Sequence, residues 1–329
     1  MPSRGTPRQP ARADALVIQT EHLDEAAAAW LGERCRLEKC PSDDPRFQNL
    51  VREASGLVIR TYTRVDDQLL DRAPKLRVVG RAGVGLDNVD LAACARRGVA
   101  VTHTPDANTR AVVEFVFSLL LDITRPRAFL DVALDTDDWK QAREVLKAGR
   151  QLCEMTLGIY GMGRIGRQLA RAATALNMPV LYHDLLEIPP AERSGATPVS
   201  REELARRSDV VSVHVDGRRS NRGLVDDAFL AFCKPEVVLV NTSRGFVVDP
   251  VALAEFMIAH RGATALLDVH EPEPFDATYP LLDIENVHLS PHIASATSLA
   301  HANMSWVVRD VWRVLNGEAP ECPAAPEPA

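Results

Sequence analysis

The sequence predicts an α/β protein made of two doubly wound parallel-sheet domains, one of them inserted into the other. Three observations support this fold class. Short runs of apolar, β-branched residues alternate with amphipathic stretches, as expected for parallel strands buried on both faces. A glycine-rich turn follows one of these runs halfway along the chain. The length of 329 residues also favours two domains over one.

The first series of elements occupies about the first hundred residues. Amphipathic stretches such as "DEAAAAWLGERC" and "NVDLAACARRG" predict helices between short apolar strands. The predicted strands are residues 15–19, 56–60, 76–80 and 99–103. A long apolar helix is expected next, over residues 109–125.

A second series of strands follows and ends in an amphipathic closing helix over roughly residues 295–317. Its predicted strands are residues 156–160, 179–184, 209–214, 237–242, 263–268 and 286–290. The glycine turn therefore follows the first strand of its own domain, which we expect to be inserted into a discontinuous first domain. The expected boundaries are 15–107 for the first part, 108–294 for the inserted domain and 295–318 for the closing segment, with disordered tails over 1–14 and 319–329.

Composition excludes several classes of protein. A net charge of −7, with no basic cluster on a reading motif, argues against a nucleic-acid surface. The six cysteines lack paired spacing, which predicts a reducing, cytoplasmic compartment and no disulfide framework or metal site. The chain has no apolar run of about 18 residues, so we expect no membrane span. The first residues lack the apolar core of a secretory signal.

The turn "TLGIYGMGRIGRQLA" (156–170) has the spacing of a dinucleotide-binding turn in a Rossmann-like domain. Gly161 permits the tight turn, Gly163 lets the backbone approach a pyrophosphate, and Gly166 lets helix and strand pack closely. Arg164 and Ile165 open the helix, whose N-terminus offers free N–H groups to phosphates. A cluster of helix-packing glycines without a ligand is the alternative. The flanking strands and helix favour a nicotinamide cofactor.

Asp184 ends the second strand of this domain, 18 residues beyond Gly166. A carboxylate at this position accepts hydrogen bonds from both ribose hydroxyls and repels a 2′-phosphate. The following residues, "LLE", include no Arg that could pair with such a phosphate. The sequence therefore predicts NAD rather than NADP.

Three later residues have the chemistry that reduction of a 2-oxo acid requires. Arg244 and His292 each come just after a predicted strand, and Glu273 lies in "LLDVHEPEPF". Ligands of open α/β sheets bind beyond the carboxyl ends of strands, so these side chains can converge. In this reaction a cation binds the carboxylate and the carbonyl of the substrate. A histidine donates a proton to the new alkoxide, and a neighbouring acidic side chain fixes the tautomer of that histidine. Taken singly, each residue could instead be an ordinary loop or core residue.

These motifs, in this order, resemble the D-isomer-specific 2-hydroxyacid dehydrogenase family, in the branch with D-3-phosphoglycerate dehydrogenase. The resemblance covers residues 15 to 318 and is carried by "GRAGVGLDNVDLAACARRGVAVTHTP", "DWKQAREVLKAGRQLCEMTLGIYGMGRIG", "VNTSRG", "LLDVHEPEP" and "SPHIASAT". It implies Arg244 as the catalytic cation, Glu273 as the supporting acid and His292 as the general acid/base. Glu273 is chosen because it precedes Pro274 and lies 19 residues before His292; Glu271 is the alternative.

The resemblance also implies further contacts. Substrate-binding residues would be Gly83, Val84 and Asn108, and Thr242 and Asp268 would lie near the nicotinamide. The architecture would be an NAD domain inserted into a discontinuous substrate domain, in a homodimer without a regulatory domain. Arg60 and Arg81 each follow a strand of the first domain, and in this branch the first of these arginines meets a phosphate. We therefore expect a substrate with a second anionic group, although Arg60, Arg81 and Arg64 could also be solvated loop residues.

The sequence departs from the family pattern at three places. "HVDGRRSNRGL" (214–224) replaces a Pro-Leu-Thr-like loop, so contacts there cannot be carried over. His270 stands where an aromatic is usual, and Ala107 replaces a Gly before Asn108. An NAD(H)-sensing corepressor or scaffold of the same fold is the main rival hypothesis. A formate-type enzyme is disfavoured, since it would carry Gln at position 273. The motifs specify a reaction class. They do not specify which 2-hydroxy acid is the substrate or in which direction the reaction runs.

Overall fold

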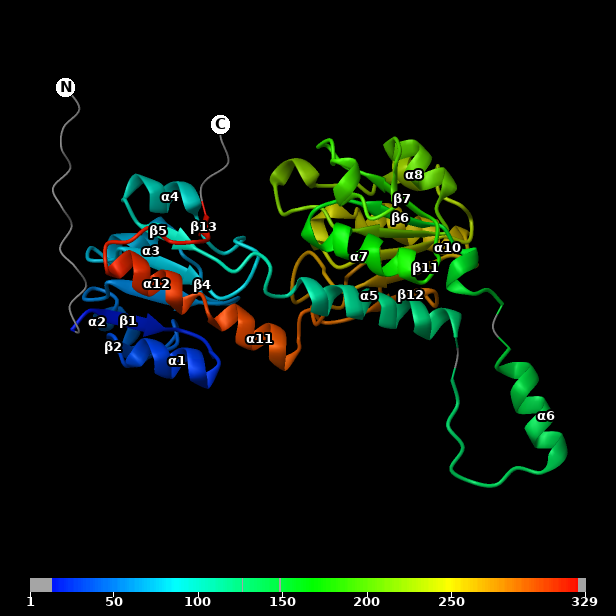
Figure 1. Ribbon diagram of the computed structural model, residues 1–329, viewed down its shortest axis with the longest axis horizontal. Helices are drawn as coiled ribbons and strands as arrows, with labels where there is room; N and C mark the ends of the chain where they lie inside the picture. The colour runs from blue at the N-terminus through cyan, green and yellow to red at the C-terminus, as the bar shows by residue number, and fades with distance from the viewer. Residues whose placement is uncertain (1–13, 126, 148, 325–329) are drawn as a thin grey trace. The chain divides into compact units, whose positions relative to one another are not determined.

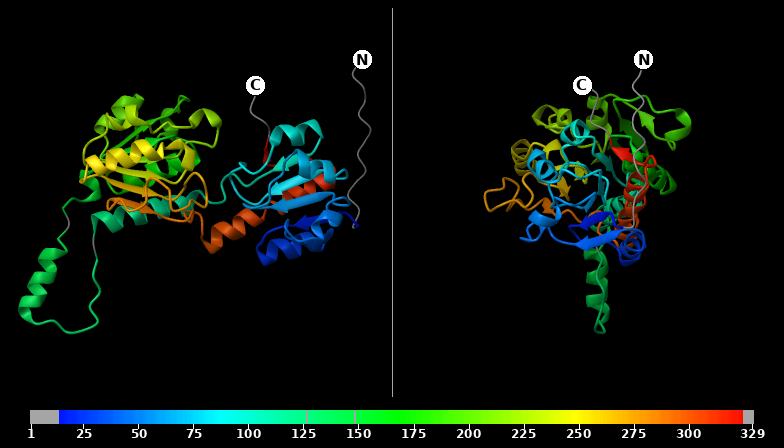
Figure 2. Two further views of the ribbon diagram at one scale, coloured as in Figure 1. Left: turned by 180° about the vertical axis from the view of Figure 1, so that it is seen from behind. Right: turned by 90° about the vertical axis from the view of Figure 1, so that its left-hand side faces the viewer.

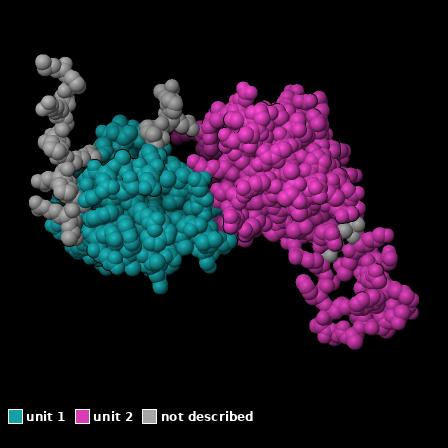
Figure 3. Space-filling model, in the orientation of Figure 1, with its two compact units in different colours: residues 1–108, 296–329 teal, residues 109–295 magenta. Residues whose placement is uncertain are grey.

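The computed structural model describes residues 14–125, 127–147 and 149–324, and the chain divides into two compact units (Figures 1 and 3). Unit 1 comprises the chain up to Asn108 together with the chain from Ala296 onward. Unit 2 comprises Thr109–Ser295. Each unit is a sheet covered by helices on both faces, and its strands are parallel except for one short edge strand of unit 1, which confirms the predicted α/β class.

The sheet of unit 1 has the strand order β13-β5-β4-β3-β1-β2. Its strands are β1 (Leu16–Gln19), β2 (Arg36–Lys39), β3 (Gly56–Ile59), β4 (Val78–Arg81), β5 (Ala100–Thr102) and β13 (Pro323–Ala324). The predicted strands match β1, β3, β4 and β5 within two residues at each end. Strand β2 was not predicted, because "RLEK" has a single apolar residue and lies at the sheet edge.

The chain from 319 to 324 is ordered, which corrects the predicted disordered tail there. Pro323 and Ala324 pair antiparallel with Thr102 and Val101 of β5. The buried carboxylate of Asp310 accepts hydrogen bonds from the amides of Glu321 and Cys322, both at 2.8 Å. Backbone pairing therefore holds a segment with little apolar content. The rest of the predicted tails, 1–13 and 325–329, lies outside the described residues.

Helices of unit 1 cover both faces of its sheet (Figure 2). One core joins the sheet to α1 (Glu25–Gly32) and α12 (Val308–Leu315); the other joins it to α2 (Phe47–Leu50), α3 (Asp67–Arg72) and α4 (Leu91–Arg96). The predicted closing helix is two helices, α11 (Ser298–Ser305) and α12, separated by a turn. Helix α12 can pack closely against β4 because residue 80 is a glycine. A Cβ at Gly80 would lie 2.4 Å from Val311 Cγ2.

The sheet of unit 2 is entirely parallel, in the order β12-β11-β10-β9-β6-β7-β8. The strands are β6 (Leu157–Tyr160), β7 (Val180–His183), β8 (Thr197–Pro198), β9 (Val210–Val213), β10 (Val238–Asn241), β11 (Thr264–Leu267) and β12 (Val287–Leu289). Because β6 pairs with β7 on one side and β9 on the other, the winding reverses at β6. Doubly wound sheets bind ligands at this reversal, beyond the carboxyl ends of the strands.

Two apolar cores lie on the two faces of this sheet. One includes residues of α5 (Thr109–Thr124) and α7 (Arg164–Ala175), and the other includes residues of α8 (Arg201–Arg207), α9 (Asp227–Leu230) and α10 (Pro250–Ala259). Helix α6 (Thr136–Val145) has no buried residue. Short 3₁₀ turns occupy Leu152–Glu154, Pro190–Glu192, Arg219–Asn221 and Gly245–Val247. Among the helices that the structure describes, none has both the length and the apolar character to cross a membrane.

Candidate active site

The three glycines of the 161–166 turn have three different surroundings. Gly161 has a φ of +101°, and a Cβ there would lie 2.7 Å from the carbonyl carbon of His214. Gly166 is packed against the strand side of the turn, because its Cβ would lie 2.2 Å from the carbonyl oxygen of Gly161. A Cβ on Gly163 would meet nothing within 4 Å. Open space at Gly163 is what the approach of a pyrophosphate requires.

Helix α7 begins directly after this turn, with Gly163 as its N-cap. Arg164 and Ile165 form its first turn; Arg164 is exposed and Ile165 is half-buried. The N-cap Gly163 supplies no side-chain cap, and the N-terminus of a helix favours an anion.

Asp184 follows β7 and reaches back to the glycine turn. Its Oδ2 accepts a hydrogen bond from the amide of Met162 at 2.6 Å, and its Oδ1 accepts one from the amide of Leu186 at 2.8 Å. A carboxylate has about four acceptor positions, so these bonds leave others for ribose hydroxyls. The prediction that Asp184 binds the ribose stays open to test.

Thr242 and Asp268 follow β10 and β11 and differ in their partners. Thr242 Oγ1 is buried and has no hydrogen-bond partner among the described residues, so a bound ligand could satisfy it. Asp268 is fully buried, and its carboxylate accepts from Ser290 Oγ at 2.5 Å, Ile293 N at 2.9 Å and Ala294 N at 2.7 Å. Asp268 therefore holds the loop that carries His292.

His292 and Glu273, 19 residues apart in the chain, are joined by a hydrogen bond. Nδ1 of His292 lies 2.8 Å from Oε2 of Glu273. An ionised carboxylate only accepts, so Nδ1 carries the proton of this bond and Nε2 is left for another group. His292 has a φ of +54°, in the left-handed region, and its amide donates to the carbonyl of Ser290 at 3.0 Å.

The pair shifts both titrations. The Glu273 hydrogen bond raises the pKa of His292 above its ordinary value, against the opposing effects of burial and of Arg244. Burial would raise the pKa of Glu273, but hydrogen bonds from His292 and from the His270 amide bring it below its ordinary value. The pairing therefore favours the protonated imidazole beside an ionised carboxylate more than an isolated histidine and glutamate would.

Glu271, the alternative acid, has a different partner. Its carboxylate binds the guanidinium of Arg222 through two contacts of 2.6 and 2.8 Å. Arg222 belongs to the unusual segment 214–224, in which Asp216 also binds Arg218 and accepts from Asn221 Nδ2 at 2.9 Å. The structure pairs Glu273 with His292 and uses Glu271 to attach this segment.

Arg244 follows β10 in the segment that packs beside the Glu273 loop. Its Nη1 donates to the carbonyl of Ser243 at 2.7 Å, and the carbonyl of Arg244 accepts from Asn241 Nδ2 at 2.9 Å. A Cβ on Gly245 would lie 2.0 Å from the carbonyl carbon of His270. This contact brings the strand ends that carry Arg244 and Glu273 together within unit 2.

The predicted substrate residues of unit 1 follow β3, β4 and β5. Gly83 has a φ of +155°, and a Cβ there would overlap the Arg81 guanidinium, 1.3 Å from Nη1. The carbonyl of Val84 accepts from His103 Nδ1 at 3.1 Å. Asn108 Oδ1 is buried and has no hydrogen-bond partner in the described part of the chain.

Arg60 lies in a polar cluster that the sequence analysis did not predict. Its Nη1 is buried without a hydrogen-bond partner among the described residues. The carboxylate of Glu21 accepts four backbone N–H groups, from residues 60 to 63, at 2.8 to 3.1 Å. His22 and His301 stack nearby, with ring centroids 5.1 Å apart. These partners come from distant parts of the chain and form no sequence motif.

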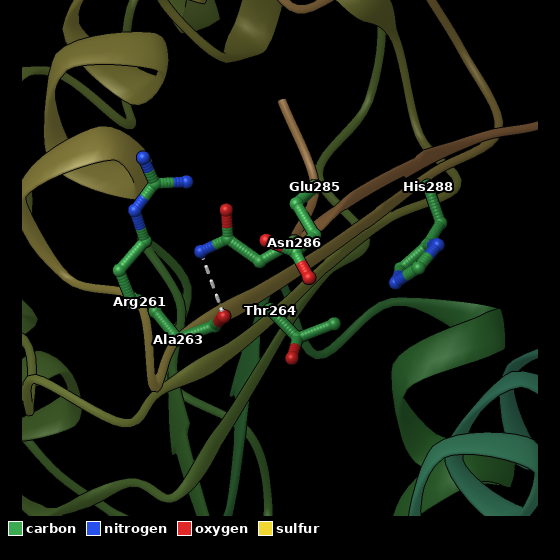
Figure 4. Close-up of a pocket in the computed structure, with 6 residues that line it drawn as sticks. All are labelled: Arg261, Ala263, Thr264, Glu285, Asn286 and His288. Carbon is green, nitrogen blue, oxygen red and sulfur yellow. Dashed lines mark hydrogen bonds between the residues drawn. The ribbon is translucent and has the colours of Figure 1, made fainter. Parts of the chain in front are cut away.

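A surface hollow in unit 2 lies away from these residues (Figure 4). It is lined by Arg261, Ala263, Thr264, Glu285, Asn286 and His288. Thr264 begins β11 and Asn286 precedes β12, so the hollow is at the amino ends of the strands. Asn286 Nδ2 donates to the carbonyl of Ala263 at 2.9 Å, which closes the end of α10. The glycine turn follows the carboxyl end of its strand, so the hollow and the turn lie at opposite ends of the strands.

Comparison with known proteins identifies one family. The family model described as "D-isomer specific 2-hydroxyacid dehydrogenase, NAD binding domain" matches residues 117–294. A glyoxylate reductase of Thermococcus litoralis is 37% identical over 292 residues, which cover 86% of this chain and 88% of that protein. An (S)-sulfolactate dehydrogenase of Chromohalobacter salexigens is 36% identical over 301 residues, covering 89% of this chain and 96% of that protein.

Longer relatives and solved structures agree with this match. A D-3-phosphoglycerate dehydrogenase of Archaeoglobus fulgidus is 34% identical over 80% of this chain and 50% of its own length. The structure of a glyoxylate reductase from Paecilomyes thermophila has a TM-score of 0.81 at 25% identity, covering 95% of this chain and 99% of that one. A D-lactate dehydrogenase from Aquifex aeolicus, complexed with NAD and lactic acid, has a TM-score of 0.77 at 25% identity, covering 92% and 96%.

Proposed function

The chain belongs to the D-isomer specific 2-hydroxyacid dehydrogenase family and is an NAD-dependent oxidoreductase, and we propose that His292 is its general acid/base. The observation that carries this proposal is the 2.8 Å bond between His292 Nδ1 and Glu273 Oε2. That bond fixes the tautomer and leaves Nε2 to protonate the alkoxide of a reduced 2-oxo acid. In the reverse direction, neutral Nε2 takes the hydroxyl proton of a 2-hydroxy acid.

Arg244 is proposed as the cation beside the substrate carbonyl and carboxylate. A guanidinium suits this task because its planar fork donates paired hydrogen bonds to oxygen anions. Its segment is held against the Glu273 loop by the close approach of Gly245 to His270. Substrate contacts at Arg81, Gly83, Val84 and Asn108 are proposed from the family pattern.

Unit 2 is proposed as the NAD domain and unit 1 as the substrate domain. NAD supplies or accepts the hydride when bound. The open space at Gly163, the N-terminus of α7 without a side-chain cap and the unsatisfied Thr242 Oγ1 fit that cofactor. Arg164, Ile165 and Asp184 are proposed to complete its site.

The proposed proton transfer is tested by His292→Ala. Turnover of a 2-oxo acid with NADH should fall by a factor on the order of 10² to 10⁴, the usual contribution of a general acid. NADH binding, measured by fluorescence titration, should be unchanged. His288→Ala is the matched control, because His288 is an exposed residue of the same segment. Turnover near wild type in His292→Ala would contradict the assignment. The relatives named above are dehydrogenases and reductases, and none supports the corepressor alternative.

The substrate is proposed to carry a second anionic group that binds Arg60. The buried, unsatisfied Nη1 of Arg60 supports this proposal, because a buried polar group without a partner is destabilising until a ligand satisfies it. Two of the relatives are named for acids with a sulfonate or a phosphate, whereas glyoxylate has no such group. A panel of 3-sulfopyruvate, 3-phosphohydroxypyruvate, oxaloacetate, glyoxylate and phenylpyruvate with NADH tests the class. Higher kcat/KM for glyoxylate or phenylpyruvate would contradict it.

A cytoplasmic homodimer is the proposed state of the protein. All six cysteines are free, as a reducing compartment requires. Helix α6 buries none of its residues, and the chain from 129 to 145 carries several exposed apolar side chains. These are Phe129, Leu130, Val132, Trp139 and Val145. Apolar side chains exposed together along one segment are typical of an interface. Light scattering after size exclusion should give twice the chain mass, and Phe129→Asp with Trp139→Asp should give the monomer; a monomeric wild type would contradict the proposal.

A further inference from the structure

His270 is a buried residue that contacts all three segments proposed to carry the chemistry. It follows β11 in "LLDVHEPEP" and is 6% exposed. In the sequence, His270 differs from the family pattern only by replacing the usual aromatic residue. Its contacts differ from those of an aromatic filler, because the backbone and both ring nitrogens have polar neighbours.

The backbone of His270 contacts two of these segments. Its amide donates to Oε1 of Glu273 at 2.7 Å, while Oε2 of the same carboxylate binds His292. The two oxygens of Glu273 are thus held by His270 and His292 in turn. The carbonyl of His270 lies against Gly245, so close that a Cβ there would come within 2.1 Å of the oxygen. Gly245 directly follows Arg244.

The side chain of His270 contacts the third segment. Nε2 lies 2.9 Å from the carbonyl oxygen of Ser290, which can only accept, so Nε2 carries the proton. The same carbonyl accepts the amide of His292 at 3.0 Å. His292 has a left-handed backbone, with a φ of +54°. A residue without glycine's freedom keeps that conformation only when its surroundings hold it.

Aromatic neighbours orient the His270 ring. Tyr279 OH lies 3.4 Å from Nδ1, which accepts because the ring proton is on Nε2. Phe275 and Tyr279 both meet the ring edge-on, with centroids at 4.8 and 5.6 Å. A phenyl ring would fill the same space and keep these contacts. It could not donate to Ser290, so the polar contact separates His270 from a packing residue.

We propose that His270 is a positioning residue, which holds the Ser290 carbonyl and the Glu273 carboxylate so that His292 keeps its geometry. The proposal rests on the proposed role of His292 in proton transfer. It adds a residue that touches neither substrate nor cofactor and acts through the turn at Ser290. The Nε2 donor is the group that matters, and the ring shape is secondary.

Three variants separate the donor from the ring. His270→Phe keeps the aromatic shape and removes the donor. His270→Gln returns a donor, since its amide nitrogen lies where Nε2 does. Tyr279→Phe is the matched control, because it removes only the long 3.4 Å contact on the other side of the ring. Folding of each variant is checked by thermal melting and by NADH affinity.

The first readout is independent of activity. The pKa of His292 is followed by NMR of ¹³C-labelled histidine, with its signal assigned by His292→Asn. His270→Phe should lower this pKa toward the ordinary value, because the Glu273 hydrogen bond that raises it is loosened. His270→Gln and Tyr279→Phe should leave it close to the wild-type value.

The second readout is steady-state reduction of the best acid of the panel. His270→Phe should lower kcat about tenfold or more, since small misplacements of a reacting group are costly, with the KM for NADH within about twofold. His270→Gln should recover most of the loss. A wild-type His292 pKa and kcat in folded His270→Phe would overturn the proposal, as would equal losses in the Gln and Phe variants. If the pKa shifts as expected but His292→Ala retains turnover, the positioning holds and the proposed function fails.

Discussion

Asp184 Oδ2 and the amide nitrogen of Met162 lie 2.6 Å apart, so the acid after β7 is bonded into the glycine turn after β6. The same carboxylate accepts the amide of Leu186 at 2.8 Å. Asp184 therefore shapes the turn as well as presenting negative charge where a ribose is proposed to bind. Removing the whole side chain would remove the charge and both acceptors of the turn, whereas Asn removes the charge and keeps one acceptor.

Asp184→Asn should narrow the preference for NADH over NADPH. Asn keeps one carbonyl oxygen, which can accept from Met162 or from Leu186 but not from both, and it no longer repels a 2′-phosphate. The ratio of kcat/KM values for the two cofactors should fall by about tenfold or more, which corresponds to about 1.4 kcal/mol. Glu187→Gln is the control, since Glu187 is an exposed acid in the same loop. Equal use of NADH and NADPH by the wild type would contradict the assignment.

Glu273→Gln should move the pH profile of reduction to lower pH. Reduction needs protonated His292, and the Glu273 hydrogen bond raises the pKa of His292. A neutral partner favours the imidazolium less, so the pKa of His292 falls and the basic limb of kcat/KM moves to lower pH. The profile of oxidation, which needs neutral His292, should extend to lower pH as well.

Glu271→Gln is the matched control for this change, because Glu271 binds Arg222. A shift in Glu271→Gln with none in Glu273→Gln would reverse the assignment. The ion pair also links stability to pH. Its stabilising effect is lost as pH falls through the lowered pKa of Glu273 and as pH rises through the raised pKa of His292. The free energy of unfolding, measured with urea at several pH values in this interval, should depend less on pH in Glu273→Gln than in the wild type.

Gly163→Ala should weaken NADH binding with little effect on stability, whereas Gly166→Ala should lower the free energy of unfolding. A Cβ on Gly163 meets nothing within 4 Å, so urea unfolding should be nearly unchanged while NADH affinity falls. A Cβ on Gly166 would lie 2.2 Å from the carbonyl oxygen of Gly161, so the helix must move. Overpacking of this kind costs about 1–3 kcal/mol of unfolding free energy. Unchanged NADH affinity in Gly163→Ala would argue against a pyrophosphate at this turn.

The strands of unit 2 could be predicted because their burial makes them continuous apolar runs. Strand β10, "VLVN", is buried at every position and was predicted as a strand from its apolar residues. The exposed pair of residues that forms β8 has no such signal. Strand β13 was also missed, because it is held by backbone pairing and by Asp310 rather than by its own apolar residues. Local patterns cannot report a contact of that kind.

The candidate site was predictable only where residues belong to a recognisable motif. Glu273 and His292 were paired by their spacing in the family pattern, and the structure shows the bond. Glu21 has no motif, yet it binds the amides of residues 60 to 63 from some forty positions away. His270 was visible only as a departure from the pattern. Its polar contacts depend on which carbonyl lies beside the ring, and that is decided by the folded chain rather than by a local sequence pattern.

Arg60→Ala should reduce activity selectively toward acids with a second anionic group. Arg60 Nη1 is buried and has no hydrogen-bond partner among the described residues, so it can bond an incoming oxygen without losing an existing contact. A hydrogen bond to a charged group contributes about 1.5–3 kcal/mol, which corresponds to a loss of about tenfold to a hundredfold. The kcat/KM for 3-sulfopyruvate or 3-phosphohydroxypyruvate should fall by that factor, and that for glyoxylate should stay within about twofold.

Arg64→Ala is the control for this prediction, because Arg64 is an exposed arginine of the same loop, 3.5 Å from Asp66. Arg64→Ala should leave the relative kcat/KM values of the acids unchanged. A change like that of Arg60→Ala would show that net positive charge alone is responsible. The neighbouring His301 gives a second measurement. Burial lowers its pKa, and Arg60 and His22 lower it further. An anion bound at Arg60 should raise that pKa, so a titration of His301 with and without 3-phosphoglycerate reports occupancy directly. An unmoved His301 and an equal loss for glyoxylate in Arg60→Ala would show that Arg60 supports the fold of unit 1 rather than the substrate.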